Sequence, residues 1–197
     1  MNHFSAVRAR LDAAGLDAVM LTEAVNRYYA VDFHSSGTDG LALVTKSANY
    51  YFTDSRYTVA AERRVRDAAI AITAPGRGYT ELLREVIERE GIRNLGFDEA
   101  YMTVADHERY KSALPCELRP ASALLAELRV SKDPDELARL TAAQRIAERA
   151  LTELLPEIRP GVTEKALAAK LTYLMLLHGA ENVSFDPIVV SGLNTTM

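Results

Sequence analysis

Histidine and carboxylate side chains are the residues of this chain that could bind a metal ion or transfer a proton. The four histidines are His3, His34, His107 and His178. None of them belongs to a His-Glu-x-x-His sequence and none lies beside the single cysteine, so the spacings typical of protein metal sites do not occur. Residues 1–197 therefore predict no metal ligand and no catalytic residue of their own.

Two other reactive side chains have structural interpretations. Cys116 has no histidine near it in the sequence that could activate a thiolate, so we expect an unreactive thiol. His178 directly precedes Gly179 at the expected end of a helix, where its ring can meet free backbone carbonyls; metal ligation is the alternative. Because a lone cysteine excludes an internal disulfide and is usual in a reducing compartment, we expect a cytoplasmic protein.

The most polar group in the first half of the chain is Asp54, Arg56 and Tyr57. Asp54 or Ser55 can cap a helix that runs through Val65, and Arg56 can pair with a carboxylate. On this interpretation the group is structural. The functional interpretation is that the turn faces a partner subunit.

Composition excludes several classes of partner. With 197 residues, 48% of them hydrophobic and 25% charged, the chain is long enough to bury a sizeable core. The formal net charge of -4 argues against nucleic acid and anionic membranes, which favour a basic surface. The basic run at residues 63–66 is explained by a solvated helix end. No stretch has the length of a membrane span or the character of a signal peptide.

The first half of the chain alternates helical and strand patterns. Apolar spacing and turn residues predict helices over residues 4–11, 23–29, 55–65, 79–90 and 103–111, and strands over 17–21, 41–45, 50–53, 69–74, 94–98 and 115–120. This order of elements indicates a mixed sheet with helices packed on its faces.

The second half begins with a helix-start sequence. Asp133 can cap the helix, Pro134 suits its first position, and Glu136 can return a hydrogen bond to the cap. The expected apolar seam is Leu137, Leu140, Gln144, Ala147, Leu151 and Leu154. Thr163 can cap a second helix that Gly179 ends.

The run Ile188-Val189-Val190 predicts a strand buried on both faces. Two helices and one strand do not close a core, so we expect the chain to end inside a domain. We also expect Leu167, Leu171, Leu174 and residues 188–190 to lack packing partners and to promote self-association.

Several stretches have an order and spacing that match a known family. They are Asn26–Phe33, Tyr51–Tyr57, Leu128–Glu136, Arg159–Glu164, and His178–Ala180 followed by Ser184–Asn194. Together they resemble the creatinase, prolidase and aminopeptidase P family of "pita-bread" metallopeptidases. One departure is Asp32, which stands where the family usually has glycine and so puts a tight backbone turn there in doubt.

The resemblance implies an α/β fold in two parts. Residues 1–128 would be a creatinase-type N-terminal domain, a ribonuclease-H-like mixed sheet with flanking helices. Residues 129–197 would be the truncated start of the pita-bread (α+β) catalytic domain, with two helices and one strand. The family's substrate-facing His and its metal ligands, which bind two divalent ions (Mn, Co or Zn), would follow residue 197, so we expect no cofactor in this chain.

The resemblance also suggests site residues. Phe185, Ser191 and Asn194 would lie at the edge of the substrate pocket of a complete enzyme, whereas Asp186 would be structural. Because family members often dimerise and use the N-terminal domain to restrict access to the neighbouring active site, Asp54, Arg56 and Tyr57 would lie at an interface or access route.

The resulting hypothesis is the N-terminal portion of an Xaa-Pro aminopeptidase or Xaa-Pro dipeptidase, non-catalytic by itself, that serves oligomerisation and substrate access. Its partners would be a second copy in a homodimer and, for the complete enzyme, proline-containing peptides. Two alternatives remain: a stand-alone binding or oligomerisation module without the catalytic domain, and a fragment of a creatine-type amidinohydrolase.

Overall fold

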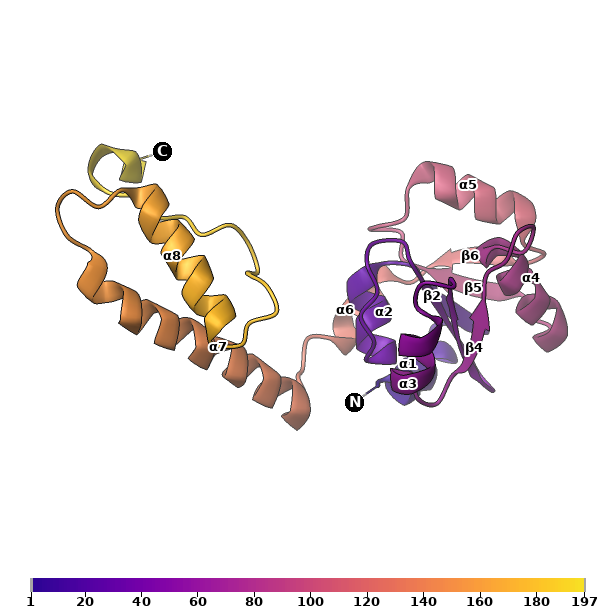
Figure 1. The fold of residues 1–197 in the computed structure, drawn as a ribbon. Coiled ribbons are helices and arrows are strands. Elements are labelled where there is room, and N and C mark those ends of the chain that lie inside the picture. Colours follow the sequence, from indigo (N-terminus) through magenta and orange to yellow (C-terminus); the bar gives the residue numbers. More distant parts are fainter. Residues whose placement is uncertain (1, 197) are drawn as a thin grey trace. The chain divides into compact units, whose positions relative to one another are not determined.

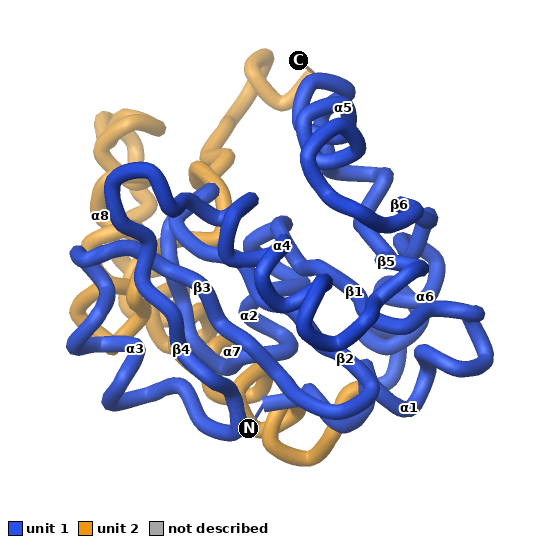
Figure 2. Tube along the Cα trace, turned by 90° about the vertical axis from the view of Figure 1, so that its right-hand side faces the viewer, with its two compact units in different colours: residues 1–131 blue, residues 132–197 orange. Residues whose placement is uncertain are grey.

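The computed structural model describes residues 2–196 and divides into two compact units, residues 1–131 and 132–197 (Figure 2). The outer ends of the two expected domains, Met1 and Met197, lie outside the described residues. The first unit is built around a sheet, and the second around two helices. No described helix combines the length and apolar character that crossing a lipid bilayer requires.

The first unit contains a six-stranded sheet with the order β4-β3-β2-β1-β5-β6. β2 pairs antiparallel with β1 and β3, and the other three pairings are parallel, so the sheet is mixed, as the sequence predicts. The strands are β1 (Ala18–Leu21), β2 (Leu41–Thr45), β3 (Asn49–Thr53), β4 (Ala69–Ile72), β5 (Asn94–Phe97) and β6 (Glu117–Pro120).

Helices cover both faces of this sheet (Figure 1). Val19 and Leu21 of β1 point into one apolar cluster, and Ala18 and Met20 point into the other, because successive strand residues face opposite sides. The first cluster is covered by α1 (Phe4–Leu11), α2 (Ala24–Val31), α3 (Thr58–Arg64) and α6 (Ser122–Leu128), and the second by α4 (Tyr79–Glu90) and α5 (Val104–Ala113).

Asp32 forms the tight turn at the end of α2 although it is not glycine. Its backbone is left-handed, with φ 55° and ψ 33°, and its N–H donates to the carbonyl of Tyr28. Aspartate adopts this conformation more readily than most residues with a side chain. The tight turn that usually contains a glycine in the family is therefore present here, with Asp32 in the glycine's place.

The start of α3 differs from the prediction. Neither Asp54 nor Ser55 caps the helix, which begins at Thr58 with Tyr57 as its N-cap and has no side-chain cap. Asp54 instead accepts hydrogen bonds from the backbone N–H and the guanidinium of Arg56. Because the carboxylate binds a residue only two positions ahead, it closes a local turn before the helix and is not available to cap it.

The second unit is an antiparallel helix pair (Figure 1). The predicted capping box is present, because Asp133 accepts from the Glu136 N–H at 2.8 Å and Glu136 accepts from the Asp133 N–H at 2.9 Å. Thr163 caps the second helix as predicted, and Gly179 has φ 100° after its end. The elements are α7 (Pro134–Leu154), η1 (Leu155–Glu157), α8 (Glu164–Leu177) and η2 (Gly192–Thr196).

Two expectations for the second unit are wrong. Leu167 and Leu174 do have packing partners: they are 8% and 4% exposed and form a small core with Ala150 and Leu154 of α7. Of the six seam positions predicted on α7 only Leu154 is buried, whereas Leu137, Leu140 and Leu151 are about half exposed. The two helices thus pack through a short contact near the end of α7.

The predicted strand at residues 188–190 does not form. The segment is irregular, Ile188 is 81% exposed, and only Val189 packs against the helix pair. A strand requires a neighbour for its backbone hydrogen bonds, and no other strand occurs among residues 132–196. The segment instead runs back along α8 toward the helix's N-terminal end (Figure 1).

Candidate functional site

A single carboxylate, that of Glu164, binds the last described residues to the start of α8. Glu164 Oε1 accepts hydrogen bonds from the Ser191 backbone N–H at 2.6 Å and from the Ser191 hydroxyl at 3.2 Å. Glu164 Oε2 accepts from Asn194 Nδ2 at 2.9 Å. Two of the three residues predicted to edge a substrate pocket are therefore brought together, and both are held by one side chain.

Local sequence explains the position of each partner. Thr163 caps α8, so Glu164 occupies its first turn, where the exposed backbone N–H groups favour a negative charge. Gly192 has φ 54°, a left-handed conformation that glycine adopts without strain, and it begins η2. The Asn194 N–H donates to the Ser191 carbonyl at 3.2 Å, which brings the Asn194 side chain to the same side as Ser191.

The electrostatics of this contact favour the ionised carboxylate. Hydrogen bonds from the Asn194 side chain and then from the Ser191 backbone hold the pKa of Glu164 below its usual value. Donors that bind the charged form stabilise it relative to the neutral acid. The loop is therefore bound by a glutamate anion at neutral pH.

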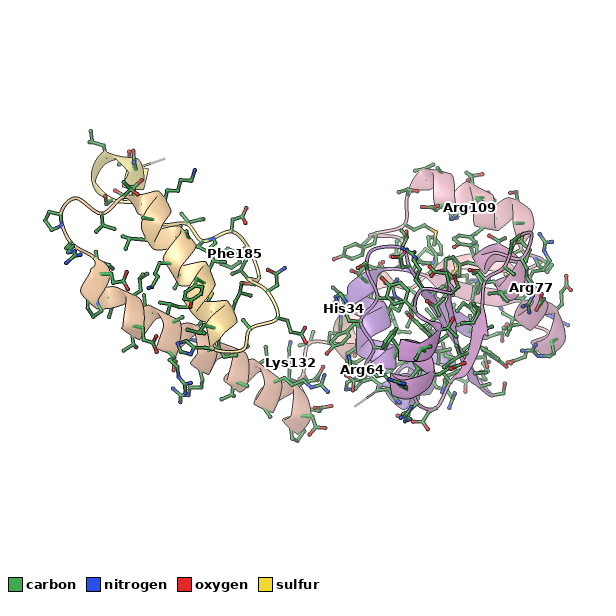
Figure 3. The ribbon with its side chains drawn as sticks, in the orientation of Figure 1. His34, Arg64, Arg77, Arg109, Lys132 and Phe185 are labelled. Carbon is green, nitrogen blue, oxygen red and sulfur yellow. The ribbon has the colours of Figure 1, made fainter. Side chains whose placement is uncertain are left out.

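Phe185 does not join this group. It lies on the irregular segment after α8 and is 72% exposed (Figure 3). Sequence reasoning missed Glu164, although it stands in the recognisable stretch Arg159–Glu164 directly after a cap residue. Glu164 pairs with Ser191 and Asn194, which lie 27 and 30 positions further along the chain. No local sequence pattern reveals such a pairing.

In the first unit, the predicted polar group of Asp54, Arg56 and Tyr57 contacts the loop before β2. Arg56 binds Asp54 Oδ2 at 2.7 Å and Asp39 Oδ1 at 2.6 Å, and the Tyr57 hydroxyl contacts Asp39 Oδ2 at 3.3 Å. The two carboxylates raise the pKa of Arg56, and Arg56 lowers the pKa of Asp54. Asp54, Arg56 and Tyr57 thus lie together, with Asp39 as a fourth member that the sequence did not suggest.

The same loop is held from inside by Arg27, which sequence reasoning also missed. The Arg27 side chain is 1% exposed, and each terminal nitrogen donates two hydrogen bonds of 2.8–2.9 Å to backbone carbonyls. The acceptors are Thr22, Ser35, Gly37 and Gly40. Burial lowers the pKa of Arg27, because desolvation disfavours the charge. This buried cation determines the shape of residues 35–40.

The two remaining candidates, His178 and Cys116, have surroundings that fit a structural role. His178 Nε2 lies 2.9 Å from Glu153 Oε1 of α7, without hydrogen-bond alignment, so its ring meets a carboxylate and not the free carbonyls expected from its position. Burial raises the pKa of Cys116 to about 11, which fits an unreactive thiol.

The side chains present do not fit the dinuclear metal centre that the resemblance implies for the complete enzyme. Within residues 2–196, neither unit taken by itself gathers three His, Cys, Asp or Glu side chains around one point. The best-organised carboxylate of the second unit, Glu164, has both oxygens engaged by N–H and O–H donors. These residues therefore support no reaction step through a metal.

Family comparisons cover both units. Residues 4–131 match the creatinase/prolidase N-terminal domain, and residues 138–197 match metallopeptidase family M24. The chain is 32% identical to the peptidase YqhT of Bacillus subtilis over 93% of this chain and 51% of that protein. It is 28% identical to the Xaa-Pro dipeptidase of Pyrococcus horikoshii over 95% of this chain and 51% of that protein. The chain thus spans about half the length of these curated relatives.

Solved structures agree with these matches. The Xaa-Pro dipeptidase of Bacillus anthracis has a TM-score of 0.84 and 32% identity, over 93% of this chain and 50% of that one. The N-terminal domain of the peptidase PepQ of Mycobacterium tuberculosis has a TM-score of 0.57 and 27% identity, over 64% of this chain and 97% of that one. The chain belongs to the creatinase/prolidase family, with that family's N-terminal domain followed by metallopeptidase M24 sequence.

Proposed function

We propose that residues 1–197 are the N-terminal half of a proline-specific metallopeptidase, an Xaa-Pro dipeptidase or Xaa-Pro aminopeptidase, that acts on proline-containing peptides. One observation carries the proposal: the chain matches a solved Xaa-Pro dipeptidase across both units, at 32% identity over 93% of its length. The two family matches also follow one another in the order that such an enzyme requires.

In such an enzyme, the two parts of this chain, residues 1–128 and 129–197, have different tasks. The first serves oligomerisation and substrate access in a cytoplasmic homodimer, with the exposed side of Arg56 and Tyr57 at the interface or access route. Support comes from the way Arg27, Asp39 and Arg56 hold the loop before β2 in one shape, since a preorganised surface binds with a smaller entropy cost.

The second part contributes an edge of the substrate pocket. Ser191 and Asn194 are held in place by Glu164, and Phe185 offers an exposed aromatic ring on the same segment. In the complete enzyme, the two divalent ions, Mn, Co or Zn, would be held by residues beyond position 197 and would supply an activated water for amide hydrolysis. Ser191, Asn194 and Phe185 of this chain would contact the substrate.

The test compares two proteins in the presence of Mn²⁺. The chain of residues 1–197 and the product of the whole reading frame that contains it are each incubated with Ala-Pro, Ala-Pro-Ala and creatine. We expect no turnover by residues 1–197 and metal-dependent cleavage of an Xaa-Pro bond by the whole product. Metal-dependent turnover stoichiometric with residues 1–197 would contradict the ligand assignment.

The same assay separates the other candidate functions. Hydrolysis of creatine without cleavage of Ala-Pro would replace the peptidase by an amidinohydrolase. A reading frame that stops after Met197 would favour the stand-alone module.

A further inference from the structure

We propose that Glu164 is a positioning residue: its carboxylate clamps residues 191–196 against the start of α8 and thereby sets how Ser191 and Asn194 face a ligand. The clamp is inferred from the hydrogen bonds of the second unit. Only the ligand-facing role of the loop rests on the proposed function.

The donors of the loop are divided between the two carboxylate oxygens of Glu164. Oε1 receives both donors of Ser191, at 2.6 and 3.2 Å, and Oε2 receives the amide of Asn194 at 2.9 Å. A carboxylate can accept on both oxygens at once, and hydrogen bonds to a charged acceptor are stronger than those between neutral groups. Loss of this one side chain would release both loop residues together.

Little else holds the loop of residues 191–196 in place. Residues 191–196 are all exposed, and Leu193 is 89% exposed, so apolar burial contributes almost nothing to their position. Their other hydrogen bonds are internal, such as Thr195 Oγ1 to the Gly192 carbonyl at 2.7 Å. Among the described residues, Glu164 is the one side chain outside the loop that hydrogen-bonds to it.

The Glu164 carboxylate also fixes the orientation of the Asn194 amide. An ionised carboxylate only accepts hydrogen bonds, so the Asn194 amide must turn its NH₂ toward Glu164. The amide oxygen then points away from the carboxylate, and no described residue donates to it. Asn194 therefore presents an acceptor, which suits a ligand that offers an N–H group, such as a peptide amide or amine.

The experiment measures amide hydrogen exchange by NMR in the chain of residues 1–197. In Glu164→Ala, we expect exchange of the Ser191 amide to accelerate by about tenfold or more, with amides of the sheet in the first unit unchanged. Glu164→Gln should show a smaller acceleration, because the glutamine oxygen still accepts from Ser191 whereas its NH₂ opposes that of Asn194. Glu181→Gln is the matched control, since Glu181 is an exposed glutamate of the same unit, and it should match wild type.

A reciprocal variant tests the polarity of the contact. Asn194→Asp places two carboxylates together and should accelerate exchange as strongly as Glu164→Ala. The double variant Glu164→Gln with Asn194→Asp restores an amide facing a carboxylate, so exchange should return toward the wild-type rate. A merely structural role of Glu164 in α8 would not predict this rescue.

Equal exchange at residues 191–196 in wild type, Glu164→Ala and Glu181→Gln would overturn the clamp. So would the absence of rescue in the double variant while α8 amides keep their wild-type protection. The result is independent of catalysis: if the product of the whole reading frame fails to cleave Xaa-Pro bonds, the proposed function fails and the clamp stands.

Discussion

The guanidinium of Arg27, 1% exposed, donates a hydrogen bond of 2.9 Å to the backbone carbonyl of Ser35, in the loop between α2 and β2. It donates to Thr22, Gly37 and Gly40 as well. One buried cation thus satisfies four carbonyls that secondary structure leaves without partners. The shape of the loop, and the position of Asp39 within it, depend on this side chain.

Substitution of Arg27 should therefore destabilise the first unit strongly. We expect Arg27→Met to lower the free energy of unfolding by about 3–5 kcal/mol, because buried carbonyls lose their donors. Arg27→Lys should recover only part of the loss, since an ammonium cannot span four acceptors as the planar guanidinium does. Chemical denaturation followed by circular dichroism measures both. A change below about 1 kcal/mol in Arg27→Met would contradict the role assigned to the side chain.

The small core of the second unit gives a paired prediction. Leu174 is 4% exposed and Ile188 is 81% exposed, although the sequence predicted that both would lack packing partners. Leu174→Ala should destabilise α8 by about 2–4 kcal/mol through a cavity, whereas Ile188→Ala should change its stability by less than about 0.5 kcal/mol. Hydrogen exchange of α8 amides reports both values. Equal effects of the two substitutions would contradict the observed packing.

Asp17 links stability of the first unit to pH. Its carboxylate accepts from the Asn94 N–H at 2.9 Å and the Arg93 N–H at 3.1 Å, and these bonds, first that from Asn94, lower its pKa with help from Lys46. The pKa of Asp17 is therefore lower in the folded state than in the unfolded state, where it is about 3.9. Asp17 stabilises the folded state above the unfolded pKa, and this stabilisation is lost as the pH falls through the folded pKa.

The measurement is unfolding by urea between pH 7 and pH 2.5 in wild type and Asp17→Asn. Wild type should lose stability more steeply than the variant below about pH 4, because only wild type must take up a proton at this position. Parallel curves for the two proteins over that range would show that the folded and unfolded pKa values of Asp17 are the same.

Arg56 provides a prediction about assembly. Its guanidinium holds Asp54 and Asp39 at the surface, where ion pairs add little to stability. If this surface contacts a second copy, Arg56→Ala should raise the dimer dissociation constant by about tenfold while the chain stays folded. Sedimentation equilibrium measures the constant, and Arg77→Ala, which breaks the exposed pair with Glu85, is the control. An unchanged constant in Arg56→Ala would exclude its side chain from the interface.

Local patterns predicted most of the secondary structure, and contacts between distant residues account for what they missed. The capping box at Asp133 and Glu136 and the cap at Thr163 depend on neighbours within three residues, so they could be read directly. The prediction of a strand at residues 188–190 was wrong, because β-branched residues form a strand only where another strand is available for pairing.

The site shows the same division. The motifs predicted site roles for Ser191, Asn194, Asp54, Arg56 and Tyr57, and these roles stay predictions. The motifs missed Glu164, Arg27 and Asp39. Each missed residue acts on a segment that folding brings close: Glu164 binds residues 27 and 30 positions away, and Asp39 binds Arg56, 17 positions away. Residue type gives no sign of such pairings in a single sequence.

The substrate preference of the protein from the whole reading frame decides whether this chain is the first half of an Xaa-Pro peptidase. The measurement is kcat/KM for Ala-Pro and for Ala-Ala, each with Mn²⁺ and after chelation. We expect cleavage of Ala-Pro to be at least about a hundredfold more efficient than that of Ala-Ala, and to be lost on metal removal. Equal cleavage of the two dipeptides, or activity that survives chelation, would contradict it.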